Sequence, residues 1–156
     1  MLEMDIPGFG LLNLKHLVSD FNGTLSIDGK LLPGVREHLK RVAGMMRVHI
    51  LTADTFGRAK SELEGINCEL RILKGENLDI QKEEYVKNLG PESVVAFGNG
   101  NNDRKMLKAA RIGIAVTESE GCSVEALLAA DIQAGSAHEA FDLLLNPERC
   151  KSTLRN

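Results

Sequence analysis

Four short segments of the chain are continuously apolar rather than alternating, and stretches with helical periodicity separate them. A strand that is apolar on both faces is typical of a parallel sheet covered by helices on both sides. Strand–helix alternation also requires right-handed crossover connections. The pattern therefore predicts an α/β fold, a three-layer, doubly wound parallel sheet. The four segments are residues 14–20, 47–52, 93–97 and 112–116.

Turn and cap residues predict the elements after the first strand. Asp28-Gly29 is typical of a type I′ turn and predicts a small hairpin over 25–32. Pro33 is expected to open the next helix at its favoured first position, and that helix ends near Gly44.

The next helix, residues 54–65, is expected to have Asp54 or Thr55 as its N-cap. Pro147 should break the last helix, so that the tail beyond it frays. The other predicted elements are a strand at 68–73, helices at 77–90, 102–110 and around 122–129, a short strand at 130–134 and a helix at 138–146.

Length and composition fit one globular domain over 1–156, with a core of about 14–146 and appended segments at 1–13 and 147–156. Hydrophobic residues make up 43% and charged residues 26% of the chain, and the formal net charge of −3 argues against nucleic acid as a partner. No apolar run approaches the ~18 residues that span a bilayer. Neither a signal peptide nor a CxxC pair is visible, so we expect a cytoplasmic protein that neither contacts a membrane nor forms disulfides.

Polar residues follow the carboxyl ends of the predicted strands. In doubly wound sheets, ligands bind beyond this edge. Acid, hydroxyl, amide and ammonium groups therefore converge on one crevice, the expected site. The clusters are Asp20–Thr24, Thr52–Asp54, Lys74–Glu76, Gly98–Asp103 and Thr117–Glu118.

The types of residue in these clusters suit phosphoryl transfer. Asp20 can act as a nucleophile toward phosphorus or bind a cation. Thr52, with nearby N–H groups, can bind phosphate, and Asp103 can face a divalent cation. Lys82 or Lys74 can neutralise the transferring group. Each residue also suits a structural role, as a turn, a cap or a solvated charge.

Taken together, these clusters resemble the haloacid dehalogenase-like (HAD) superfamily of phosphohydrolases and phosphotransferases. Residues 20–24, DFNGT, look like its first motif, DxDGT, and Thr52 ends a segment similar to its second. Lys82 matches the lysine of its third motif, and GNGNND at 98–103 resembles its fourth, GDGxND. Order and spacing fit from residue 14 to about 116, most closely to capless, soluble, P-type-ATPase-like members.

The resemblance implies that Asp20 attacks phosphorus and becomes phosphorylated, with Mg²⁺ as cofactor and a small or macromolecular phosphorylated substrate. It further implies a HAD Rossmann-like core. The implied roles are catalysis by Asp20, Asn22, Thr52 and Lys82, phosphate binding by Asn22, Gly23, Thr52, Ala53 and Lys82, and metal binding by Asp20, Asn22, Asn99 and Asp103.

Two positions depart from the family pattern, because Asn22 and Asn99 stand where its phosphatases usually have acids. An amide cannot transfer the proton that general acid–base catalysis needs, which is typically worth ~10²–10⁴-fold, so we expect slow turnover. The alternative is a catalytically weakened module that binds a phosphorylated ligand or a partner protein. A receiver-like domain is disfavoured, because the first strand ends without an acidic pair.

The spacing of the motifs leaves no room for a cap domain. Asp20 and Thr52 are 32 positions apart, and Thr52 and Lys82 are 30 apart. Each interval is filled by elements of the core. We therefore expect an open site, which suits a macromolecular substrate or a homo-oligomer in which a neighbouring copy closes the site.

Overall fold

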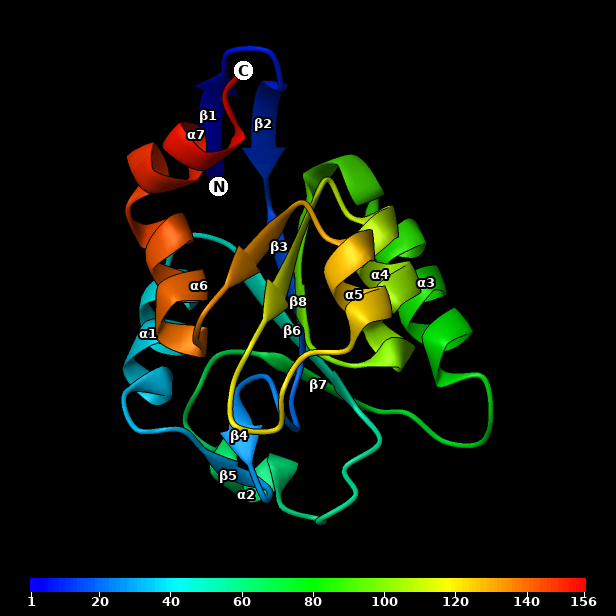
Figure 1. The fold of residues 1–156 in the computed structure, drawn as a ribbon. Coiled ribbons are helices and arrows are strands. Elements are labelled where there is room, and N and C mark those ends of the chain that lie inside the picture. Colours follow the sequence, from blue (N-terminus) through cyan, green and yellow to red (C-terminus); the bar gives the residue numbers. More distant parts are fainter.

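The computed structural model describes all of residues 1–156 and has the predicted α/β fold. Six parallel strands form one sheet in the order β10-β9-β8-β3-β6-β7, with helices on both faces (Figure 1). The strands are β3 (His16–Asp20), β6 (Arg47–Thr52), β7 (Glu69–Ile72), β8 (Val94–Gly98), β9 (Ile112–Val116) and β10 (Ile132–Ala134). This order places β3, and with it Asp20, at the centre of the sheet.

The helices divide into two layers (Figure 1). The first lies against the larger hydrophobic core and contains α1 (Val35–Ala43) and α6 (Ala137–Leu145). The second contains α3 (Leu78–Leu89), α4 (Arg104–Ala109) and α5 (Val124–Ala129). Two short 3₁₀ turns, η1 (Pro91–Ser93) and η2 (Asn101–Asp103), precede β8 and α4 respectively. All three layers of the prediction are therefore present.

The predicted hairpin is confirmed. Strands β4 (Ser26–Ile27) and β5 (Lys30–Leu31) pair antiparallel, and Asp28 and Gly29 have φ angles of 52° and 80°. Positive φ at both central residues is what a type I′ turn requires.

Two helix starts were predicted wrongly. Helix α1 begins at Val35 rather than at Pro33, because Gly34 takes a left-handed φ of 81° at the N-cap. Helix α2 spans only Ala59–Glu62, because the segment before it turns through left-handed φ angles of 53° at Asp54 and 66° at Gly57, which a right-handed helix excludes.

Both chain ends carry secondary structure that the sequence did not reveal. Strands β1 (Leu2–Ile6) and β2 (Gly10–Leu14) form an antiparallel hairpin. The expectation of a frayed tail was wrong, since α7 (Pro147–Leu154) is a helix with Pro147 in its first turn and a fully buried Cys150. No helix in the structure is long and apolar enough to cross a membrane.

Candidate active site

Asp20 is the last residue of β3, a central strand that pairs parallel with β6 and β8, and Asp20 itself lies opposite Leu51 of β6. Its side chain is buried at the carboxyl edge of the sheet. Asp20 therefore lies where the sequence predicted it, at the carboxyl edge of the sheet.

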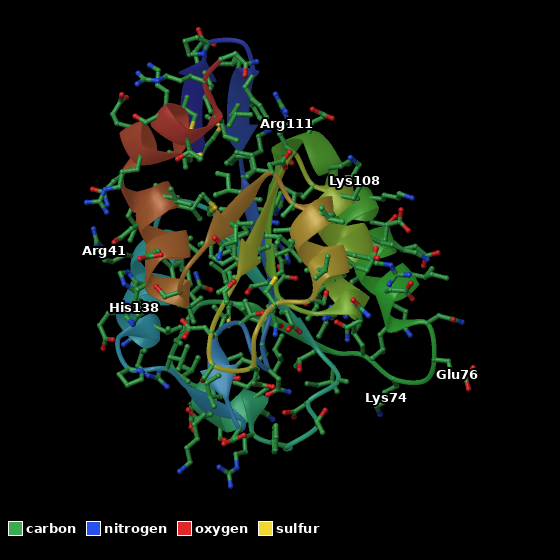
Figure 2. All side chains as sticks on the ribbon, in the orientation of Figure 1. Arg41, Lys74, Glu76, Lys108, Arg111 and His138 are labelled. Atoms are coloured by element: carbon green, nitrogen blue, oxygen red, sulfur yellow. The ribbon has the colours of Figure 1, made fainter.

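Lys82 lies on the inner face of α3 and reaches Asp20. Its ammonium Nζ is 2.9 Å from Asp20 Oδ1 and 2.7 Å from Asp103 Oδ1, and only 1% of the residue is exposed. Lys74, the competing lysine, lies exposed on the loop before α3 and points away from the sheet (Figure 2). The geometry thus brings Lys82, and not Lys74, to the candidate nucleophile.

Asp103 organises the loop after β8. Its Oδ2 accepts hydrogen bonds from the backbone N–H groups of Asn99 and Gly100, each at 3.0 Å, while Oδ1 accepts from Lys82. Gly98 makes this turn feasible, because a Cβ at that position would lie 2.5 Å from Asp103 Cβ. Asp103 therefore orients both the loop and the lysine.

The loop after Asp20 leaves selected backbone groups free. Phe21 O accepts from the N–H groups of Thr24, Leu25 and Ser26, and Gly23 N–H donates to Ser26 O. The N–H and carbonyl oxygen of Asn22 have no partner in the protein. The N–H of Gly23, which was expected to bind phosphate, is therefore already used within the hairpin. The N–H of Asn22 remains available.

Thr24 and Asn99 join the loops after β3 and β8. Thr24 Oγ1 lies 3.3 Å from Asp20 Oδ2 and 3.1 Å from Asn99 Oδ1, and shares its single hydroxyl proton between them. Asn99 Nδ2 donates to Gly121 O at 3.2 Å. A carboxylate at position 99 could not make this last bond, which gives the amide a structural reason to be there. Gly121 was not singled out from the sequence, because its contribution is a backbone carbonyl.

Thr52 ends β6 and lies buried at the same edge of the sheet. Its Oγ1 accepts from Asp54 N–H at 2.9 Å, which leaves the hydroxyl proton available. Ala53 N–H has no partner in the protein. These donors come from a tight turn and not, as expected, from a helix N-terminus. Asp54 instead caps α2 from a distance, since its Oδ1 accepts from the N–H groups of Arg58 and Ala59.

Two close carboxylates and one ammonium group set the electrostatics of this cluster. Burial and the neighbouring Asp103 carboxylate raise the pKa of Asp20 to about 6, against the opposing effect of Lys82. Burial alone would lower the pKa of Lys82, but the two carboxylates outweigh it and raise the pKa above its ordinary value. Lys82 therefore stays protonated, and the cluster has a net charge of −1 when both carboxylates are ionised.

A comparison with protein families identifies the chain. The family described as haloacid dehalogenase-like hydrolase matches residues 58–140, just over half of the chain. The chain belongs to this family. The match includes Lys82 and Asp103 and begins after the loop that carries Asp20.

Two relatives have similar sequences. An uncharacterised protein of Methanocaldococcus jannaschii is 42% identical over 74 residues, which cover 47% of this chain and 80% of that protein. A probable copper-exporting P-type ATPase of Archaeoglobus fulgidus is 39% identical over 94 residues. That match covers 60% of this chain but only 11% of the ATPase.

Solved structures share the fold. The cobalt-bound deoxy-D-mannose-octulosonate 8-phosphate phosphatase of Haemophilus influenzae has a TM-score of 0.66 at 17% identity, over 92% of this chain and 94% of the phosphatase. The Moraxella catarrhalis 3-deoxy-D-manno-octulosonate 8-phosphate phosphatase was solved with magnesium and phosphate ions. It has a TM-score of 0.61 at 18% identity, over 89% of this chain and 90% of the phosphatase. A zinc-transporting PIB-type ATPase has a TM-score of 0.60 at 25% identity, over 79% of this chain and 20% of the ATPase.

Replacing Asp20 with asparagine should stabilise the protein at neutral pH. Because the folded-state pKa is raised, ionisation of Asp20 costs stability as pH rises from about 4 through 6. The Asp20→Asn variant should therefore unfold at a higher temperature than the wild type at pH 8, with the gain vanishing near pH 4. Thermal unfolding followed by circular dichroism measures this.

The matched control is Asp5→Asn, at an exposed aspartate on β1. It should show no comparable pH-dependent gain. An Asp20→Asn variant that is less stable than the wild type at every pH would contradict the electrostatic account.

Proposed function

We propose that the protein is a Mg²⁺-dependent phosphohydrolase or phosphotransferase that forms an aspartyl phosphate on Asp20. The observation that carries the proposal is the buried cluster in which Lys82 bridges Asp20 and Asp103. Such a cluster supplies a nucleophile and a fixed positive charge at one point. Phosphoryl transfer requires mainly positioning and neutralisation of charge.

Oxygen atoms around Asp20 fit a hard divalent cation. Asp20 Oδ2 receives only the long 3.3 Å hydrogen bond from Thr24, and the Asn22 carbonyl oxygen receives none. Asn99 Oδ1 lies 3.1 Å from Thr24 Oγ1, the same hydroxyl that lies 3.3 Å from Asp20 Oδ2. No group of three or more His, Cys, Asp or Glu side chains is arranged to hold a metal, so main-chain and amide oxygens would complete the ligand set. We propose Asp20, Asn22 and Asn99 as ligands. Asp103 was also expected to bind the metal, but its oxygens accept from Lys82, Asn99 N–H and Gly100 N–H, so we propose that it supports the ligands instead.

When bound, Mg²⁺ would neutralise charge on the phosphoryl oxygens and orient the phosphate. The first step is attack of an Asp20 carboxylate oxygen on phosphorus, which breaks the bond to the leaving oxygen. Lys82 balances the charge that gathers there. The Thr52 hydroxyl and the N–H groups of Asn22 and Ala53 would hold the phosphoryl oxygens. The leaving oxygen takes its proton from bulk water. Attack of water on the same phosphorus then breaks the bond to Asp20 and releases phosphate, and the attacking water gives its proton to bulk solvent.

Asn22 limits the rate in this scheme. Its side chain is half-buried, and its Oδ1 accepts a long 3.4 Å hydrogen bond from Ser26 Oγ. An amide neither protonates the leaving oxygen nor removes a proton from the attacking water. We therefore propose slow turnover. The second candidate function, a weakened module that binds a phosphorylated ligand or partner, is favoured by the same residue and by the structural use of the Asn99 amide.

The substrate class follows from what covers the site. The β4–β5 hairpin directly follows the loop after Asp20, and Leu31 N–H anchors it by donating to Glu62 Oε2 at 3.1 Å. No cap domain is inserted on either side of Thr52. We propose a phosphorylated substrate that is large or held on a macromolecule, or a homo-oligomer in which a second copy closes the site.

Hydrolysis of p-nitrophenyl phosphate tests this proposal. The wild type should release p-nitrophenol only with Mg²⁺, and chelation by EDTA should abolish the activity. Asp20→Asn should lower the rate at least about 10³-fold, because the nucleophile is lost. Asp5→Asn serves as the control and should keep the wild-type rate. Activity that survives Asp20→Asn would sink the assignment.

Substituting Asn22 with aspartate separates the two candidate functions. If the wild type is a slow enzyme, Asn22→Asp should raise its rate by about tenfold or more, since a proton donor and acceptor is restored. Activity that appears only in Asn22→Asp would instead identify a weakened binding module. A rate unchanged from a measurable wild-type value would show that Asn22 does not limit turnover. Asn99→Asp is a poorer test alone, because it breaks the bond to Gly121.

A further inference from the structure

A cavity of about 650 Å³ lies at the amino ends of β3, β6 and β7, at the sheet edge opposite Asp20. We call it the basal pocket, and it is lined in part by Lys15, His16, Met46, Arg47 and Cys68. His16 and Asp20 are the first and last residues of β3, about 13 Å apart along a strand. Small-molecule sites commonly have volumes of about 300–1,000 Å³. The basal pocket is thus separate from the candidate active site and large enough for a small ligand.

Two unpaired cations lie on its wall. Arg47 N–H donates to Lys15 O at 2.9 Å, which places the backbone of Arg47, the first residue of β6, beside that of Lys15, the residue before β3. Neither side chain takes part in an ion pair. Glu69, the acid on the wall, lies 3.7 Å from His49 Nδ1, but burial lowers the pKa of His49, so a neutral imidazole leaves the Glu69 charge unbalanced. Two cations face this one acid on the wall, so its net charge is positive in a chain with a net charge of −3, which favours an anion.

His16 adds a polar group to the same wall. Its Nδ1 lies 3.0 Å from His49 Nε2, and His49 Nδ1 lies 2.9 Å from the Tyr85 hydroxyl. When Tyr85 donates to His49, His49 donates to His16, and the neutral His16 ring carries its proton on Nε2. Nε2 has no partner in the protein, and an anion in the pocket favours this arrangement.

The pKa of His16 lies below its ordinary value, which favours the neutral ring. Burial lowers it most, and the cations Arg47 and Lys15 lower it further, against an opposing contribution from Glu69. The neutral ring can donate a hydrogen bond from Nε2 to an anion.

The rest of the wall includes apolar, sulfur-containing side chains. Met46 is almost fully buried, Met45 and Cys68 are half-buried, and all three line the cavity. Methionine adapts to irregular ligand shapes, because its side chain is unbranched and polarisable. A ligand with an apolar body beside its charged group would therefore contact both kinds of surface.

We propose that the basal pocket binds a small organic anion. A phosphate-like or carboxylate group contacts Lys15, Arg47 and His16, and an apolar body contacts Met46 and Cys68. The site is independent of the proposed phosphoryl-transfer function. Its occupant also contacts His16, whose hydrogen-bonded chain ends at Tyr85, one helical turn beyond Lys82 on α3.

Titration of the ¹⁵N-labelled chain with phenylphosphonate tests the proposal by NMR. This probe has a charged head and an apolar ring, and its carbon–phosphorus bond is not a phosphate ester. Amide signals of Asn67 and Cys68 and the His16 ring signals should shift and saturate. The double variant Lys15→Met, Arg47→Met should weaken binding there at least about tenfold, because two charge-assisted contacts are lost.

The control double variant is Lys108→Met, Arg155→Met, which removes two exposed cations outside the basal pocket; Lys108 lies on α4 (Figure 2). It should bind like the wild type. Benzyl alcohol, the uncharged probe, should bind at least about tenfold more weakly than phenylphosphonate. Shifts confined to the loops around Asn22 and Ala53 would overturn the proposal. So would equal affinity in the two double variants, or equal affinity for the two probes.

Discussion

The buried ammonium group of Lys82 is the interaction on which the rest of the site depends. It contacts Asp20 from the central strand and Asp103 from the loop after β8. Two ionised carboxylates at this depth would repel each other and lose their hydration without a counter-charge. Helix α3 must therefore pack where Lys82 reaches both. The single negative charge that remains when all three groups are ionised would attract the divalent cation that we propose for this site.

The surrounding loops have the shapes that this contact demands. Gly98 lets Asp103 approach the strand end, and Gly23 lets the Asn99 amide approach the first loop, where a Cβ would lie 2.6 Å from Asn99 Nδ2. Asn99 in turn joins Thr24 to Gly121. The Asn99 amide therefore has a structural role, since an aspartate could not donate the hydrogen bond to Gly121 O. Asn22 has no such role, so the proposed loss of rate rests mainly on Asn22.

Much of the fold could be predicted, because a strand buried on both faces leaves a continuous apolar run, as at 112–116. The placement of Asp20, Thr52 and Asp103 at one edge of the sheet followed from the shared edge of parallel strands. Selecting Lys82 over Lys74 needed the packing of α3, which local sequence does not encode. The left-handed backbone at Gly34 and Asp54 belongs to local turns that hydrophobic periodicity does not reveal, and it explains the misplaced helix starts. The burial of Cys150 depends on tertiary packing, and it explains the ordered tail.

Trapping the phosphoenzyme tests the central claim most directly. The protein is incubated with Mg²⁺ and acetyl phosphate, quenched in acid, and reduced with borohydride so that an aspartyl phosphate becomes homoserine. Peptide mass spectrometry then locates the modified residue. The account predicts homoserine at position 20 in the wild type, dependent on Mg²⁺ and absent after treatment with hydroxylamine before reduction. Modification at another aspartate, or none at position 20 while phosphate is being released, would contradict it.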